Sequence, residues 1–307
     1  MKHLLLTAAS VWLIMQPGTA AAQTRIEAIL VPNEGNPTRI WINSVGTTGI
    51  RFYQTAQTTA LNDFALSQAR TIYFPESRSF SGAMQQFRAR DYRAAAESFG
   101  NVAAEFRPVH LLPNNPSSRA AFFEIESLRL LGDYAKMSEK LGAFQKSGIS
   151  RENEIRQLEL NLMWDAIGRE AWDQLGHLVE RHATSRLPGD QRAQVAYCMG
   201  LVREKKGETK EAIDAYNEAM IVDAAASEVV ARMAALAILR IHDADPDVKV
   251  ARDMWGSENF KTSVPGYAKL LEAGAVARIF EEFVGAGTPL PDQYKAYLDY
   301  KAPDPES

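Results

Sequence analysis

The spacing of apolar residues changes once along the chain, between Phe74 and Ser79. Before this point apolar and polar residues alternate in short runs, which is the period of half-buried β-strands. After it, apolar residues recur every three or four positions, and this pattern of amphipathic helices continues almost to the carboxyl end. The pattern therefore predicts a small β region followed by a long, mainly α region.

The β region contains four or five short runs that are typical of strands. The clearest runs cover residues 25–31, 39–45, 49–53 and 71–74. Between the second and third, Gly46-Thr47-Thr48 predicts a hairpin turn. This spacing of strands is similar to that of the SH3-like or Sm-like barrels that are fused to helical repeats in bacterial envelope proteins. We therefore expect a small β-barrel domain over residues 23–75.

The clearest helical stretch runs from residue 193 to residue 226 and predicts two helices joined at Gly207. Glycine takes a positive φ without steric cost, so Gly207 marks the end of the first helix. Ala212 and Ala219 lie seven residues apart on one face of the second helix. Gly200 faces them from the first helix, so we expect the two backbones to approach closely.

Together with Tyr216, these small residues resemble a tetratricopeptide repeat, in which small, alanine and aromatic residues hold fixed positions. Weaker copies surround turns that we expect near residues 90, 132 and 169. The resemblance implies helical pairs stacked in a superhelix over residues 76–243, followed by a C-terminal helical cap and tail at 244–307. It also implies a concave groove, lined by the first helix of each pair, in which members of the family bind proteins or peptides.

Repeat position, carried over from the family, assigns candidate residues to this groove. They are Phe80, Met84, Phe87, Arg119, Phe122, Glu126, Arg129, Arg156, Glu159, Met163, Gln194, Tyr197 and Glu204. For each of them, packing in the core or simple solvation is an equally open alternative. Phe122 and Arg129 are seven residues apart and therefore share one face, where they would suit an apolar side chain and a carboxylate of a partner.

The first 22 residues have the form of a secretion signal. A short basic start is followed by an apolar run at 4–15, a break at Gln16-Pro17-Gly18, and Ala20-Ala21-Ala22, which fits the cleavage rule. The apolar run is too short to span about 30 Å of hydrocarbon as a helix, which argues against a membrane anchor. We expect a mature chain that begins at Gln23 and is periplasmic or secreted.

Charge and cysteine content narrow the kinds of partner. The chain has 38 acidic and 34 basic side chains, a balance that argues against nucleic acid or an anionic membrane as the main partner. Cys198 is the only cysteine, so no internal disulfide forms, and we interpret it as a small buried residue. The expected partner is a protein or peptide of the cell envelope.

The candidates for catalytic or metal-binding residues have simpler structural explanations. Asp243, Asp245 and Asp247 are spaced like the start of a calcium loop, but valine follows where glycine is required. His177 and His182 are five residues apart and point in different directions from a helix. The sequence has no zinc-protease motif, serine-hydrolase elbow or glycine-rich phosphate loop. We expect a non-catalytic scaffold without cofactor or metal; the alternative is an envelope hydrolase whose residues meet only after folding.

Overall fold

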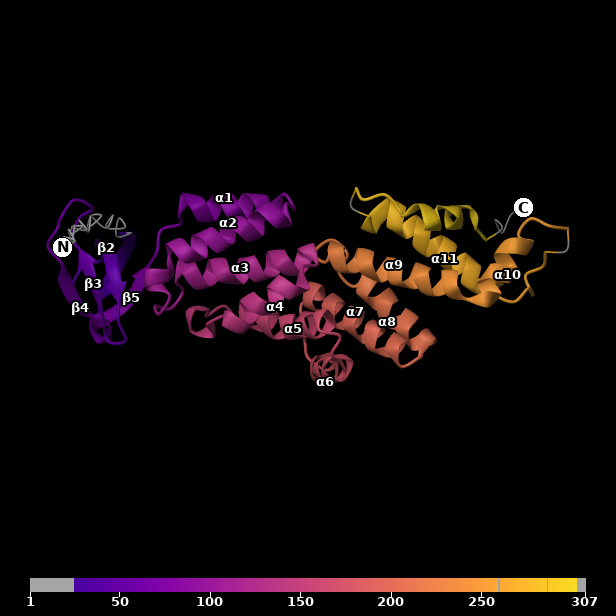
Figure 1. The fold of residues 1–307 in the computed structure, drawn as a ribbon, viewed down its shortest axis with the longest axis horizontal. Helices are drawn as coiled ribbons and strands as arrows, with labels where there is room; N and C mark the ends of the chain where they lie inside the picture. Colours follow the sequence, from indigo (N-terminus) through magenta and orange to yellow (C-terminus); the bar gives the residue numbers. More distant parts are fainter. Residues whose placement is uncertain (1–24, 259, 286, 303–307) are drawn as a thin grey trace, which may run out of the picture. The chain divides into compact units, whose positions relative to one another are not determined.

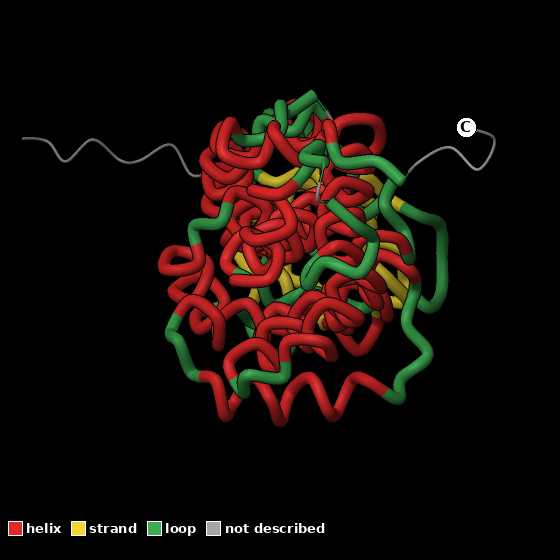
Figure 2. Tube along the Cα trace, turned by 90° about the vertical axis from the view of Figure 1, so that its right-hand side faces the viewer, coloured by secondary structure: helices red, strands yellow, loops and turns green. Residues whose placement is uncertain are grey.

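A computed structural model describes residues 25–258, 260–285 and 287–302. The predicted secretion signal lies outside these residues. The chain divides into two compact units, Met1–Pro75 and Glu76–Ser307 (Figure 1). Strands form the first unit, and helices form most of the second (Figure 2).

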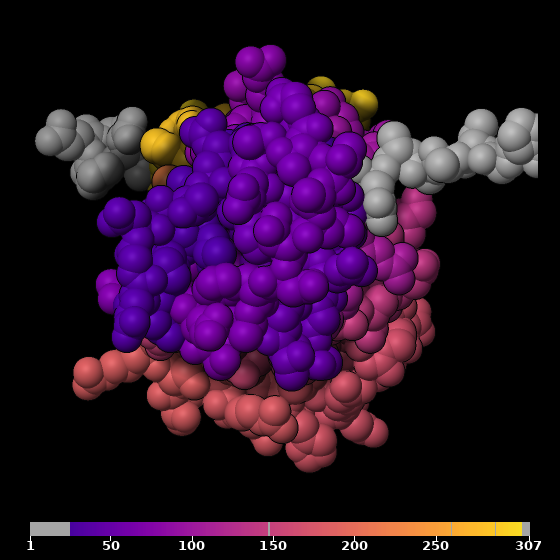
Figure 3. Space-filling view, turned by 90° about the vertical axis from the view of Figure 1, so that its left-hand side faces the viewer, coloured from indigo at the N-terminus to yellow at the C-terminus, as the bar shows by residue number. Residues whose placement is uncertain are grey.

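The first unit is an antiparallel sheet of five strands. Its atoms are coloured indigo in the space-filling view of Figure 3. Its elements are β1 (Ile26–Pro32), β2 (Thr38–Val45), β3 (Gly49–Tyr53), β4 (Asn62–Ala65), the 3₁₀ turn η1 (Leu66–Gln68) and β5 (Ala69–Tyr73). The strand order is β4-β3-β2-β1-β5, with Ala28 opposite Ile40 and Leu30 opposite Ile72. The predicted hairpin joins β2 to β3 and brings Val45 opposite Ile50.

The period of two in the sequence places one apolar side of the sheet in the core. Ile26, Ala28 and Leu30 are buried on β1, as are Ile40 and Ile42 on β2. The expectation of a closed barrel needs correction, because in the described residues the strand order is linear and leaves β4 and β5 as the two edges. The polar sequence of β4, which begins Asn-Asp, hid this strand from the apolar pattern.

The second unit opens with eight helices that follow one another as packed neighbours. They are α1 (Arg78–Arg88), α2 (Tyr92–Glu105), α3 (Pro116–Leu131), α4 (Tyr134–Ala143), α5 (Glu152–Gly168), α6 (Trp172–Ala183), α7 (Gly189–Lys205) and α8 (Thr209–Ile221). The 3₁₀ turns η2 (Arg107–Val109) and η3 (Lys146–Gly148) lie between them. The odd-numbered helices also contact one another in sequence, α1 with α3, α3 with α5, α5 with α7 and α7 with α9 (Glu228–Ala244). The odd-numbered helices therefore form one layer of the unit.

Four of the helix connections have the same backbone conformation. The residues Arg90, Gly132, Glu170 and Gly207 have φ values of 64°, 80°, 54° and 77°. In each turn their N–H donates to the carbonyl three residues back, and the next N–H donates to the carbonyl five residues back. These bonds satisfy carbonyls at a helix end, as in the Schellman motif. The turns lie within one residue of the four positions expected from the sequence.

The α7–α8 pair packs as its small residues predict. Ala212 and Ala219 are fully buried, and Gly200 lies against the ring of Tyr216. The hydroxyl of Tyr216 donates to a carboxylate oxygen of Glu204 at 2.9 Å, which fixes the ring in place. Close approach at Gly200 therefore sets the position of Tyr216.

The C-terminal part of the unit contains α9, α10 (Pro246–Met254), α11 (Tyr267–Ile279), the π-helical turn η4 (Phe280–Val284) and the 3₁₀ helix η5 (Asp292–Asp299). Asp245 caps α10 through a side-chain oxygen that accepts from the N–H of Asp247 at 2.8 Å. The apparent calcium spacing at Asp243 to Asp247 therefore corresponds to a helix start. Gly274 lets the backbone of η5 approach α11 closely.

Candidate functional site

A cavity of about 260 Å³ lies among α1, α2, α3, α7 and the start of α9, and we name it the inner pocket. Its lining residues come from four separate stretches of the second unit. They are Phe87, Tyr92, Glu126, Arg129, Leu130, Asp190, Gln194, Ala226, Ser227, Glu228, Val229 and Val230. The inner pocket thus joins the first helical pair to α9, more than a hundred residues further along the chain.

A buried ion pair forms part of the pocket lining. On α3, Nη2 and Nε of Arg129 donate to Glu126 at 2.8 and 3.2 Å, and both side chains are more than nine-tenths buried. Asn161 on α5 donates to the other oxygen of Glu126 at 2.7 Å. Each buried charge is therefore both paired and hydrogen-bonded, the condition under which charges persist in a protein interior.

The hydrogen-bond network continues from this pair across the layer of odd-numbered helices. Gln157 donates to Asn161 and exchanges hydrogen bonds with Gln194, all at 3.0 Å. The indole N–H of Trp164 also donates to Gln194, at 2.9 Å. The guanidinium of Arg129 lies 5.6 Å from the centroid of the Trp164 ring. The network cross-links α3, α5 and α7 and gives the inner pocket a rigid polar wall.

An ion pair between distant segments lies beside the inner pocket. Arg90, in the turn after α1, binds the carboxylate of Glu228 in the first turn of α9, 138 residues away in sequence. Phe87 and Tyr92 flank this turn, and Val229 and Val230 follow Glu228. Burial raises the pKa of Tyr92, and the Glu228 carboxylate raises it further. The contact connects the turn after α1 with the start of α9 beside the pocket.

Asp190 differs from the other acidic residues of the pocket. Glu126 is paired with Arg129 and Glu228 with Arg90. In the described part of the chain, no cation or hydrogen-bond donor pairs with the Asp190 carboxylate. Asp190 lies in the first turn of α7, near the positive end of the helix dipole.

Four of the groove residues assigned by repeat position line the inner pocket: Phe87, Glu126, Arg129 and Gln194. They lie on α1, α3 and α7, three of the odd-numbered helices. Phe80, Phe122, Met163 and Tyr197 instead lie in the core. Their rings or thioether fill space between helices, so they are not available as a binding surface. Met84 is half-buried outside the pocket lining.

The remaining assigned residues have separate surroundings. Half-buried Arg119 lies over the Phe80 ring at 4.9 Å, and burial lowers its pKa. Arg156 donates to Glu152 at 2.8 Å, and Glu159 is exposed. The carboxylate of Glu204 accepts hydrogen bonds from both terminal nitrogens of Arg240, at 2.6 and 2.7 Å. These contacts give Arg119, Arg156 and Glu204 structural roles outside the pocket.

Glu204 should make stability depend on pH. Hydrogen bonds from Arg240 lower its pKa most, with a further contribution from Tyr216. The folded pKa therefore lies below that of the unfolded chain, so the stabilisation is present above the unfolded value of about 4.3 and is lost as the pH falls through the folded value. We expect Glu204→Gln to lower the free energy of unfolding at pH 7, and this difference to shrink below pH 4. Urea unfolding at pH 7, 5 and 3.5 measures it.

The exposed residue Glu159 supplies the control for this measurement. Glu159→Gln should leave the free energy of unfolding nearly unchanged at all three pH values. A difference between wild type and Glu204→Gln that stays constant down to pH 3.5 would contradict the pKa assignment.

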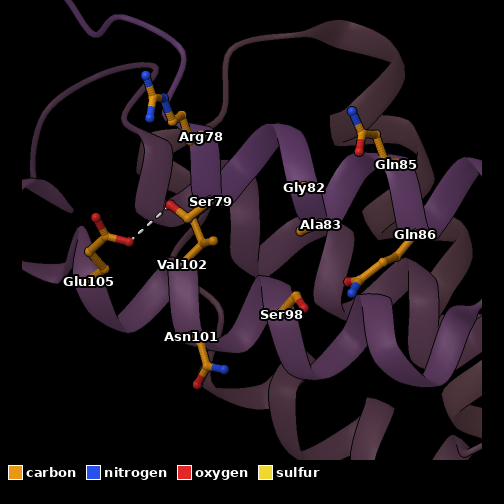
Figure 4. Close-up of a pocket in the computed structure, with 10 residues that line it drawn as sticks. All are labelled: Arg78, Ser79, Gly82, Ala83, Gln85, Gln86, Ser98, Asn101, Val102 and Glu105. Atoms are coloured by element: carbon orange, nitrogen blue, oxygen red, sulfur yellow. Dashed lines mark hydrogen bonds between the residues drawn. The ribbon is translucent and has the colours of Figure 1, made fainter.

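A second cavity, of about 500 Å³, lies between α1 and α2 (Figure 4). Its lining includes the neutral polar side chains of Ser79, Gln85, Gln86, Ser98 and Asn101. Ser79 donates to Glu105 at 3.0 Å at one end. None of the groove residues assigned from the sequence lines this second cavity.

The sequence missed several residues of the inner pocket: Tyr92, Leu130, Asp190 and the stretch 226–230. Tyr92 belongs to a second helix, which the repeat pattern assigns to packing. The stretch 226–230 follows the last clear repeat, so no sequence signal placed it beside α1. Its position depends on how far the helical layers curve.

Cys198 is buried, and burial raises the pKa of its thiol, which disfavours the reactive thiolate. In the described ranges, no group of three or more potential ligands could hold a metal ion. No helix of the described chain is long and apolar enough to cross a membrane. No protein family, curated protein or solved structure matches the sequence or the fold.

Proposed function

We propose that the chain is an exported, non-catalytic scaffold whose helical unit binds a protein or peptide of the cell envelope in the inner pocket. The observation that carries this proposal is the pocket itself. It is framed by the odd-numbered helices that would form the concave layer of a tetratricopeptide-like superhelix, and four residues assigned by repeat position line it. A pre-formed cavity with a rigid wall suits recognition of a partner's side chain.

The four matching helix connections support the tetratricopeptide-like interpretation of the second unit. In the first unit, β5 returns to pair with β1 after a meander of four strands, with a 3₁₀ turn between β4 and β5. The repeated helix connections thus support the proposal of a protein-binding scaffold.

The alternative function, an envelope hydrolase, would require a carboxylate or nucleophile free to act on a substrate. Within the inner pocket, Glu126 accepts hydrogen bonds from Arg129 and Asn161. Such bonds hold the carboxylate in one position, which suits a structural role more than proton transfer. Asp190 is the lining carboxylate without a partner among the described residues, but the lining contains no histidine, cysteine or lysine to act with it. The geometry thus favours binding over catalysis.

Affinity capture with pocket-filling variants tests the proposal. Ala226 is exposed and lines the inner pocket, so Ala226→Phe should fill the cavity without disturbing the core. The adjacent exposed residue Ala225 lies outside the lining and gives the matched control Ala225→Phe. We expect tagged wild type and Ala225→Phe to capture the same envelope protein, identified by mass spectrometry, and Ala226→Phe to lose at least about nine-tenths of it.

Equal capture by all three chains would overturn the assignment of binding to the inner pocket. Circular dichroism and the melting temperature of each variant show whether a loss of capture reflects a filled pocket or an unfolded chain.

A further inference from the structure

The inner pocket combines apolar and charged walls. Leu130, Ala226, Val229 and Val230 supply aliphatic surface, and the neighbouring lining contains the aromatic side chains of Phe87 and Tyr92. The rings of Phe87 and Tyr92 meet edge to face with centroids 5.6 Å apart. A ligand that fits such walls has an apolar body and a polar end.

The charges of the pocket determine the sign of that polar end. Two ion pairs, Arg129 with Glu126 and Arg90 with Glu228, are neutral as pairs. Asp190 remains as the lining charge without a partner among the described residues. The lining therefore has an excess negative charge.

We propose that the inner pocket takes a basic side chain of the partner, arginine in preference to lysine, with Asp190 as its ion-pair acceptor. This inference rests on the proposed function and names the chemistry that the pocket recognises. The long aliphatic stem of a basic side chain packs on apolar surface while its charged head stays with polar groups. Arginine is favoured because its planar head binds a carboxylate through two nitrogens and also stacks on aromatic rings.

The arginines of the protein itself do not occupy this acceptor. Arg129 is held by Glu126, and Arg90 by Glu228. Arg232, which adds positive potential at Tyr92, donates to the carbonyl of Gly285 and the hydroxyl of Thr288 at 3.2 and 3.1 Å. An anionic ligand at the same place would face the carboxylate of Asp190 beside two ion pairs that carry no net charge. The charge distribution thus favours a cation.

Two small probes of the same shape separate charge from fit. N-acetyl-arginine amide carries the guanidinium, and N-acetyl-citrulline amide replaces it with a neutral urea group. Each is titrated into the isotope-labelled full chain, and NMR follows the backbone amides of Gln194 and residues 227–230. We expect saturable shifts with the arginine probe and at least about tenfold weaker binding of the citrulline probe.

Two matched variants test whether the Asp190 carboxylate is the group that binds the arginine probe. Asp190→Asn should reduce binding of the arginine probe to the level of the citrulline probe. Asp173→Asn changes an exposed carboxylate in the first turn of α6, outside the pocket, and should leave the binding unchanged. Because the Asp190 side chain is only half-buried, its replacement should not unfold the chain.

Equal binding of the two probes, shifts confined to residues outside the pocket, or undiminished binding by Asp190→Asn would each overturn the inference. If any one of these outcomes is found while Ala226→Phe still abolishes partner capture, the inference about the basic side chain fails. The proposed function stands in that case. If the arginine probe binds through Asp190 but Ala226→Phe captures the partner normally, the pocket binds cations and the scaffold function must reside elsewhere.

Discussion

Replacing Gly200 by alanine should lower the free energy of unfolding by about 3 kcal/mol. A Cβ added at Gly200 would come within 3.0 Å of three atoms of the Tyr216 ring, a separation that real Cβ atoms essentially never show. The ring cannot move aside easily, because Tyr216 is fully buried and its hydroxyl is bound to Glu204. Urea unfolding followed by circular dichroism measures the change.

A second glycine controls for the helix propensity of alanine. Gly176 lies within α6, and the nearest heavy atom to an added Cβ there is Cγ1 of Val202 at 3.9 Å, an ordinary contact. Gly176→Ala should therefore leave stability unchanged or raise it by up to about 1 kcal/mol. Equal stabilities of the two variants would show that α7 and α8 do not approach as closely as the structure indicates.

Replacing Glu126 by alanine should destabilise the fold by about 3–5 kcal/mol, because Arg129 would then be a buried charge without its partner. Asn161 would lose an acceptor in the same step. The thermal unfolding midpoint and the free energy from urea unfolding both report this loss. Glu152→Ala removes an exposed ion pair with Arg156 and should cost less than about 1 kcal/mol.

The double variant Glu126→Leu with Arg129→Met tests the cause of the instability. It removes both buried charges and fills their space with apolar groups, so it should be more stable than Glu126→Ala alone. A double variant as unstable as the single one would mean that lost packing, and not an unpaired charge, dominates the effect.

Local chemistry determined much of the secondary structure. Gly132 and Gly207 adopt the positive φ that ends α3 and α7. Asp91 and Asp133 cap the starts of α2 and α4 by accepting hydrogen bonds from backbone N–H groups. These effects involve residues close in sequence, so they are visible without the tertiary structure. The polar edge strand β4 was missed because its stability comes from pairing with β3, which the apolar pattern does not report.

The sequence alone thus determined the change from strands to helices, the turn positions and four residues of the inner pocket. Only the tertiary structure decided which groove candidates are buried, and that α9 meets the first helical pair through Glu228 and Arg90. Helical periodicity fixes which face of a helix a residue occupies, but it does not determine what lies opposite that face. That depends on small rotations between successive helical pairs, which accumulate over the 138 residues between Arg90 and Glu228.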